Sequence, residues 1–118
     1  MSIYQTVVET PEFIRQAERC MDAPSRQHFI NYIAQSPLAG DVMPGTGGIR
    51  KVRWTGNSHQ GKRGGMRVIY VYYAQTMPLF LLTVYGKGQE ENLTMKEQNA
   101  LKVLVKQLIQ HYQGGRHE

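Results

Sequence analysis

The sequence contains a single cysteine, Cys20, among its 118 residues. One thiol cannot form an intramolecular disulfide, and Cys20 follows an apolar pattern of helical spacing, which favours a small buried side chain over a nucleophile. No apolar run approaches the length of a membrane span, and the first residues lack the layout of a secretory signal. We therefore expect a cytoplasmic protein that makes no use of a membrane.

Acidic residues are missing from the middle of the chain. None occurs between Asp41 and Glu90, although the net charge of the whole chain is only +5. A continuous segment of one charge sign attracts polyanions, so we expect an anion here, with RNA backbone as the first candidate. A solvated basic face without a ligand is the alternative. The cations of this segment are Arg50, Lys51, Arg53, Lys62, Arg63, Arg67 and Lys87.

Residue patterns for metal or nucleotide chemistry are also lacking. The histidines are scattered and the basic segment has no carboxylate pair, so neither a zinc site nor a two-metal nuclease is predicted. The stretch GNSHQGK at 56–62 matches the phosphate-loop spacing. However, Arg63 stands where a hydroxyl would bind magnesium, and a strand follows instead of a helix. We reject nucleotide hydrolysis and expect no metal and no cofactor.

The pattern of apolar residues predicts one α+β domain over residues 1–118. The last three strands are joined by short connections, so they should be adjacent and antiparallel. The strand at 66–74 is apolar on both faces and should be central. The final helix starts with a capping box, Thr94 to Glu97. A strand is expected at 2–9, followed by a helical hairpin. Its first helix starts at Thr10, and its second starts at Ser25 after an interruption at Pro24. The remaining elements are a loop at 36–48, strands at 49–54, 66–74 and 79–87, and a helix from 94 to Gly114.

Strand alternation and pairing bring the basic residues together. Lys51 and Arg53 alternate along one strand and share a face, while Arg67 begins the strand that pairs with it. Lys87 ends the last strand and Tyr85 precedes it on the same face. We expect these side chains to converge at one end or one face of the sheet, where arginine binds phosphate bidentately and Tyr85 stacks on a base.

These stretches resemble a known family. GTGGIRKVRW, GKRGGMRVIYVYY, LFLLTVYGK and a helix beginning NLT are similar to the HigB branch of the RelE/ParE toxin superfamily, over about residues 36–105. The resemblance implies a small RelE-like fold, with an antiparallel sheet, an N-terminal helical hairpin and a C-terminal helix. It also implies the toxin of a type II toxin–antitoxin pair, usually a metal-independent endonuclease that cuts messenger RNA on the ribosome and so inhibits translation.

The resemblance implies partners as well. They are the ribosome with its messenger RNA, and a cognate HigA-like antitoxin that carries a DNA-binding domain. Operator DNA would be bound only through the complex of the two proteins.

The catalytic residues of the family carry over in part. Lys51, Arg53 and Arg67 match its basic positions. Where RelE-type members have a further arginine, this chain has Gly88 with Lys87 beside it, and residues 89–94 lack the tyrosine of that pattern. We expect Lys51 to act as base, Arg53 and Arg67 to bind the phosphorane, and Lys87 to assist the leaving oxygen. Arg50, Lys62, Arg63 and Tyr85 are the expected RNA-binding residues.

Two other functions remain open from the sequence. ParE-like relatives inhibit DNA gyrase and cut nothing, and a plain nucleic-acid-binding module would bind RNA without cleaving it. Clustered cations on alternating strand positions favour the nuclease, because phosphate chemistry needs concentrated positive charge. Codon preference, oligomeric state and the surface that binds the antitoxin do not follow from the sequence.

Overall fold

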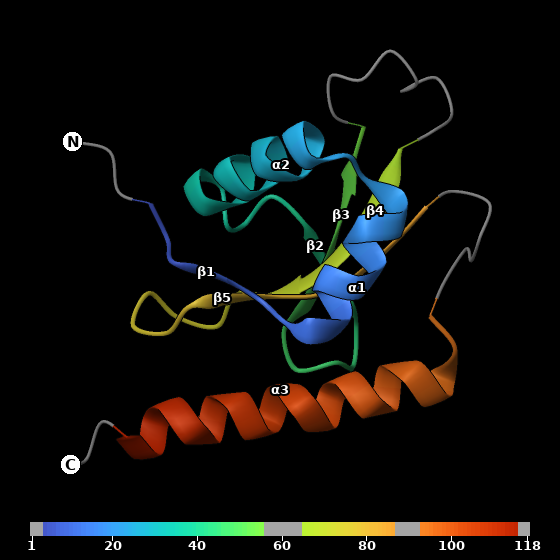
Figure 1. Ribbon diagram of the computed structural model, residues 1–118. Helices are drawn as coiled ribbons and strands as arrows, with labels where there is room; N and C mark the ends of the chain where they lie inside the picture. Colours follow the sequence, from blue (N-terminus) through green and yellow to red (C-terminus); the bar gives the residue numbers. More distant parts are fainter. Residues whose placement is uncertain (1–3, 56–64, 87–92, 116–118) are drawn as a thin grey trace.

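A computed structural model describes residues 4–55, 65–86 and 93–115 (Figure 1). It confirms the α+β class. Within these ranges no helix has the length and apolar character needed to cross a membrane. The elements are β1 (Val7–Glu9), α1 (Pro11–Cys20), α2 (Ala23–Gln35), β2 (Asp41–Val42), β3 (Ile49–Trp54), β4 (Met66–Val71), β5 (Leu79–Gly86) and α3 (Met95–Gly115).

The strands form one sheet in the order β1-β5-β4-β3-β2. The predicted antiparallel neighbours β3, β4 and β5 are confirmed. Two predictions about the edges were wrong. The N-terminal strand is shorter than 2–9 and pairs with β5 in parallel, so the sheet is mixed. The loop predicted at 36–48 contains the short edge strand β2, which pairs with β3.

Side-chain caps define the first two helices. Thr10 accepts a hydrogen bond from the backbone N–H of Phe13 and so caps α1, as predicted. The second helix starts earlier than Ser25, because Asp22 is its cap and Pro24 lies in its first turn. Proline is tolerated there, since the first N–H groups of a helix have no intrahelical partner. Pro24 therefore belongs to the helix instead of interrupting it.

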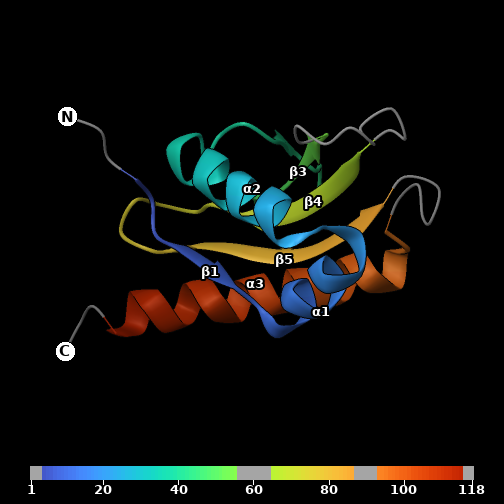
Figure 2. The same cartoon turned by 45° about the horizontal axis from the view of Figure 1, so that its top comes forward.

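Both faces of the sheet are covered, as predicted from the apolar residues on both faces of β4. On one face, Phe13 and Ala17 of α1 and Phe29 and Ile33 of α2 pack against the strands. On the other face, side chains of α3 do so, with Val105 buried (Figure 2). The apolar run of β4 supplies both layers: Val68 and Tyr70 face α1 and α2, while Ile69 and Val71 face α3.

The predicted capping box of α3 is present. The Thr94 N–H donates to the Glu97 carboxylate at 2.8 Å, and the Glu97 N–H donates to the Thr94 hydroxyl at 3.1 Å. These bonds satisfy backbone donors that a helix N-terminus otherwise leaves unpaired. The capping box therefore starts α3, and the apolar stripe that follows packs the helix against the sheet.

Candidate nucleic-acid interface

The strand register brings the predicted basic residues onto one row. Arg53 of β3 lies directly opposite Arg67 of β4, and Arg67 lies directly opposite Tyr85 of β5. Lys51 is two residues before Arg53 and therefore points to the same face. We call Lys51, Arg53 and Arg67 the cation row. It lies on the face of the sheet that α3 partly covers.

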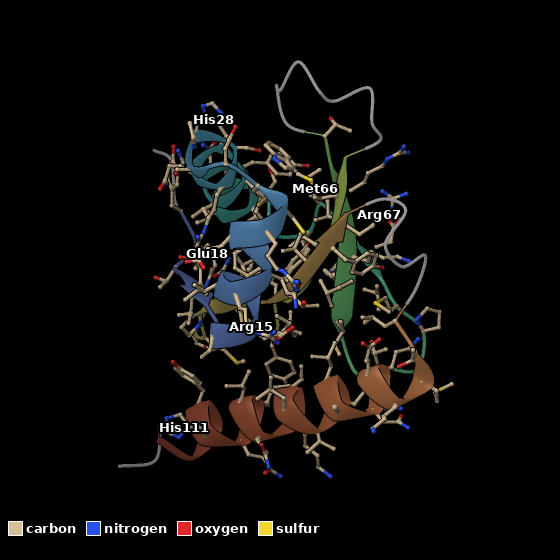
Figure 3. All side chains as sticks on the ribbon, turned by 45° about the vertical axis from the view of Figure 1, so that its right-hand side comes forward. Arg15, Glu18, His28, Met66, Arg67 and His111 are labelled. Atoms are coloured by element: carbon tan, nitrogen blue, oxygen red, sulfur yellow. The ribbon has the colours of Figure 1, made fainter. Side chains whose placement is uncertain are left out.

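Arg67 is the most enclosed member of the cation row. Its residue is half-buried, and its Nη1 atom is buried without a hydrogen-bond partner among the described residues. Figure 3 shows Arg67 at the end of the sheet, projecting to the opposite side from its neighbour Met66. Arg53 is exposed. Neither Arg53 nor Arg67 takes part in the ion pairs that join Arg15 to Glu12 and Arg26 to Glu9 among the described residues.

Two like charges on opposed strand positions repel each other. The acid that the register brings to this part of the sheet, Asp41 of β2, lies opposite Lys51 and not opposite either arginine. Such an arrangement lowers the stability of the free protein and raises its affinity for an anion. A phosphate placed between Arg53 and Arg67 would accept hydrogen bonds from both guanidinium groups. The chemistry of the two arginines therefore suits an anion with several acceptor oxygens.

Gly65 positions the start of β4. Its φ of +74° is in the left-handed region, and a Cβ at this position would lie 2.6 Å from the carbonyl oxygen of Trp54. Only glycine allows the chain to approach Trp54 this closely and then enter the register that pairs Arg67 with Arg53. The predicted residues Lys62, Arg63 and Lys87 lie outside the described residues.

Arg50 does not belong to the cation row. It pairs with Tyr70 in the register and points to the face of α1 and α2, where its Nη1 donates to the carbonyl of Gly40 at 2.6 Å. The Tyr70 hydroxyl accepts from the Gly40 N–H and donates to the carbonyl of Pro37, each at 2.8 Å. Arg50 thus holds the segment after α2 and lies apart from the cation row, and its expected RNA-binding role stays a prediction. Strand alternation already separates Arg50 from Lys51 and Arg53.

Tyr85 also differs from its expected role. Its side chain is only 9% exposed and lies in the apolar cluster beneath α3. A ring buried to this extent has no free face on which a base can stack, so we correct the stacking interpretation. Its position opposite Arg67 makes it part of the support beneath the cation row.

Other candidate groups lie away from this chemistry. Burial raises the pKa of the Cys20 thiol above its usual value, with a smaller opposing effect of a hydrogen bond to the Gly86 backbone. A raised pKa disfavours the thiolate, which is the nucleophilic form, in keeping with a packing role. Among the described residues, no group of histidine, cysteine and acidic side chains is arranged to hold a metal ion.

Comparison with solved structures identifies the architecture. No family model matches the sequence. A mutant of the Escherichia coli toxin RelE, with two arginines replaced by alanine and solved in the free state, superposes with a TM-score of 0.56. The match covers 87% of this chain and 98% of that one, at 14% sequence identity. The chain has a RelE-like fold.

The RelE-like fold explains where the cation row lies. In this fold the antiparallel strands β3, β4 and β5 are contiguous, so basic residues from separate parts of the chain meet on one face. Strand alternation in the sequence identified the members of the cation row. It did not show which contacts position each side chain. Gly65 was the available signal, because a glycine directly before a strand often marks a backbone turn that other residues cannot adopt.

Proposed function

We propose that this protein is the toxin of a type II toxin–antitoxin pair, of the HigB kind, and that it cuts messenger RNA during translation. One observation carries the proposal: Arg53 and Arg67 oppose each other on paired strands, Lys51 lies on the same face, and neither arginine forms an ion pair with a described acid. The likeness to the RelE toxin supports it at the level of the fold.

The cation row suits cleavage by the RNA itself. The 2′-hydroxyl attacks the adjacent phosphorus, the bond to the 5′-oxygen breaks, and the products are a 2′,3′-cyclic phosphate and a 5′-hydroxyl. Lys51 accepts the proton of the attacking hydroxyl in our scheme. Arg53 and Arg67 bind the additional negative charge of the phosphorane. Preorganised donors aimed at developing charge contribute about 3 kcal/mol each to lowering a barrier.

The enclosure of Arg67 strengthens its part in this scheme. A guanidinium nitrogen removed from water, and without a partner in the described structure, interacts with phosphate at a lower effective dielectric than an exposed one. Lys87, which lies outside the described residues, would donate a proton to the leaving oxygen. Lys62 and Arg63, also outside them, would hold messenger or ribosomal backbone without taking part in the chemistry.

The proposed partners follow from this function. A HigA-like antitoxin with a DNA-binding domain would neutralise the toxin, and the complex would bind operator DNA through the antitoxin. The ribosome would present the messenger to the cation row. The cytoplasm is the proposed compartment, because translated messenger RNA is found there.

The test is to induce the protein in cells and map the 5′ ends of a reporter messenger, with and without its start codon. We expect cuts inside translated codons that disappear when the start codon is removed. Arg67→Gln should lower cleavage about 100-fold or more, as removal of one charge-stabilising donor does elsewhere. Arg15→Gln is the matched control, since Arg15 pairs with Glu12 on the exposed surface of α1.

Other outcomes would change the assignment. Growth arrest with intact messengers and DNA damage signalling would indicate a ParE-like gyrase inhibitor. Salt-sensitive RNA binding without cleavage products would indicate a nucleic-acid-binding module. Full cleavage by Arg67→Gln would remove the cation row from the mechanism.

A further inference from the structure

An open groove of about 360 Å³ lies between the turn that precedes β3 and the side of α3. In Figure 1 this turn, drawn in green, reaches the middle of α3. The groove is distinct from the cation row and uses residues to which we have assigned no role so far. Its lining residues are Gly45, Thr46, Gly47, Lys102, Val105, Lys106, Ile109 and Gln110.

One wall of the groove is fixed by Thr46. Its buried hydroxyl donates to the carbonyl of Met43 at 2.6 Å and accepts from the Ile49 N–H at 3.1 Å. The N–H of Met43 also donates to the carbonyl of Ile49 at 2.8 Å, which closes the turn at its base. A wall held by three such bonds is preformed, so a ligand would bind without ordering it first.

The floor of the groove is apolar, and its rim is positively charged. Ile109 is half-buried and gives the floor of the groove its apolar surface, with the buried Val105 beneath it, while Lys102 and Lys106 are exposed one helical turn apart. No acid is among the lining residues. An apolar floor gains nothing from a phosphate, which needs hydrogen-bond donors around it. Burial of an apolar side chain against this floor is favourable, and carboxylates beside that side chain would attract the lysines.

We propose that this groove is an anchoring site for an acidic, amphipathic segment of the antitoxin, which rests on the proposed function. An apolar side chain of the segment packs against Ile109, above the buried Val105, and flanking carboxylates pair with Lys102 and Lys106. Along β3, at roughly 3.3 Å per residue, Lys51 lies about 7 Å and Arg53 about 13 Å from Ile49 beside the groove. A segment held in the groove therefore anchors the antitoxin without reaching Arg53 and Arg67, and another part of the antitoxin must cover them.

Charge reversal on the rim tests this anchoring. The probe is the purified antitoxin, titrated into the full chain by calorimetry. We expect Lys102→Glu/Lys106→Glu to weaken binding at least tenfold and to reduce its dependence on salt. Lys96→Glu is the matched control, because Lys96 is an exposed lysine of the same helix outside the groove and should leave binding unchanged.

Methyl NMR on the full chain locates the contact independently. On adding antitoxin, the methyl signals of Val105 and Ile109 should shift. Those of Val103, which is 58% exposed on α3 and does not line the groove, should stay in place. This readout needs no substitution, so it holds even if a variant folds poorly.

The outcomes separate this inference from the proposed function. If the antitoxin binds the double variant normally, or leaves Val105 and Ile109 unshifted, the anchoring site is wrong while the toxin assignment stands. If the double variant instead loses messenger cleavage, the groove binds RNA and the inference is overturned. Concentration-dependent self-association that the double variant abolishes would assign the groove to a second copy of the chain. Absence of messenger cleavage by the unmodified chain is a failure of the nuclease proposal alone.

Discussion

Two arginines of this chain each bury a guanidinium nitrogen that lacks a partner among the described residues, yet they differ in consequence. Arg50 keeps a short bond to the Gly40 carbonyl and thereby holds the segment after α2. Arg67 has no such bond to any of the described residues and lies opposite Arg53. We infer that Arg50 contributes to stability, whereas Arg67 lowers stability in the free protein and serves an anion.

Replacing each of these arginines by methionine separates the two roles, because methionine keeps an unbranched stem. Arg67→Met should raise the free energy of unfolding by about 1 kcal/mol, since it removes a like-charge pair and a buried unpartnered donor. Arg50→Met should lower it by about 1 kcal/mol, since the Gly40 carbonyl loses its donor. Urea denaturation of both variants measures these changes.

The control for this comparison is activity. Arg67→Met should abolish messenger cleavage despite its higher stability, the pattern expected of a residue retained for function. Arg50→Met should retain cleavage wherever it remains folded. A destabilised Arg67→Met protein would mean that Arg67 has a structural partner in the part of the chain that the structure does not describe.

At the scale of the elements, two threonine caps are used differently. Thr10 begins α1, and its hydroxyl also donates to the carbonyl of Leu81 at 2.8 Å, so the cap joins the helix to β5. Thr94 begins α3 through an exposed capping box and makes its bonds only within its own helix. The first cap therefore fixes a helix onto the sheet, and the second only starts a helix.

The loss of each cap should follow this difference. Thr10→Ala should lower the free energy of unfolding by about 2 kcal/mol, the upper end of measured cap losses, because it also leaves the Leu81 carbonyl without this donor. Thr94→Ala should lower it by about 0.5 kcal/mol. Urea denaturation again measures both, with Thr76→Ala in an exposed turn as the neutral control. Equal losses at the two caps would contradict the link between α1 and β5.

At the scale of the whole molecule, the positive charge is divided between functions. The cation row lies on the sheet, whereas Lys102 and Lys106 lie beside the groove on α3. Arg15 and Arg19 lie on α1, which covers the opposite face of the sheet from the row. A net charge of +5 therefore does not describe one uniform basic surface.

Salt dependence should report this division. For single-stranded nucleic acid the logarithm of affinity falls with the logarithm of salt by about 0.7 per phosphate contact. Arg53→Gln/Arg67→Gln should therefore reduce the slope for binding to a messenger-loaded ribosome by about 1.4. Arg15→Gln/Arg19→Gln removes the same charge and should leave the slope unchanged. Equal effects of the two pairs would mean that net charge alone drives binding.

Much of the fold was predictable because its signals are local. The hydroxyl caps at Thr10 and Thr94, the apolar stripe of α3 and the three central strands all follow from residues close in the chain. The parallel pairing of β1 with β5 was not predictable in this way. It joins segments more than 70 residues apart, and no local pattern selects such a partner.

The sequence by itself determined that Lys51 and Arg53 share a strand face and that the middle of the chain is without acid. Tertiary structure decided what stands opposite them: Asp41 and Ile69 lie on either side of Lys51, and Arg67 lies opposite Arg53. An irregularity between Ile69 and Tyr70 in the pairing with β5 shifts the register, and it brings Tyr85 to the same face as Leu82. Hydrogen bonds between distant strands set that register, and the packing of α3 against the turn at Thr46 forms the groove. Both depend on contacts that exist only once the chain is folded.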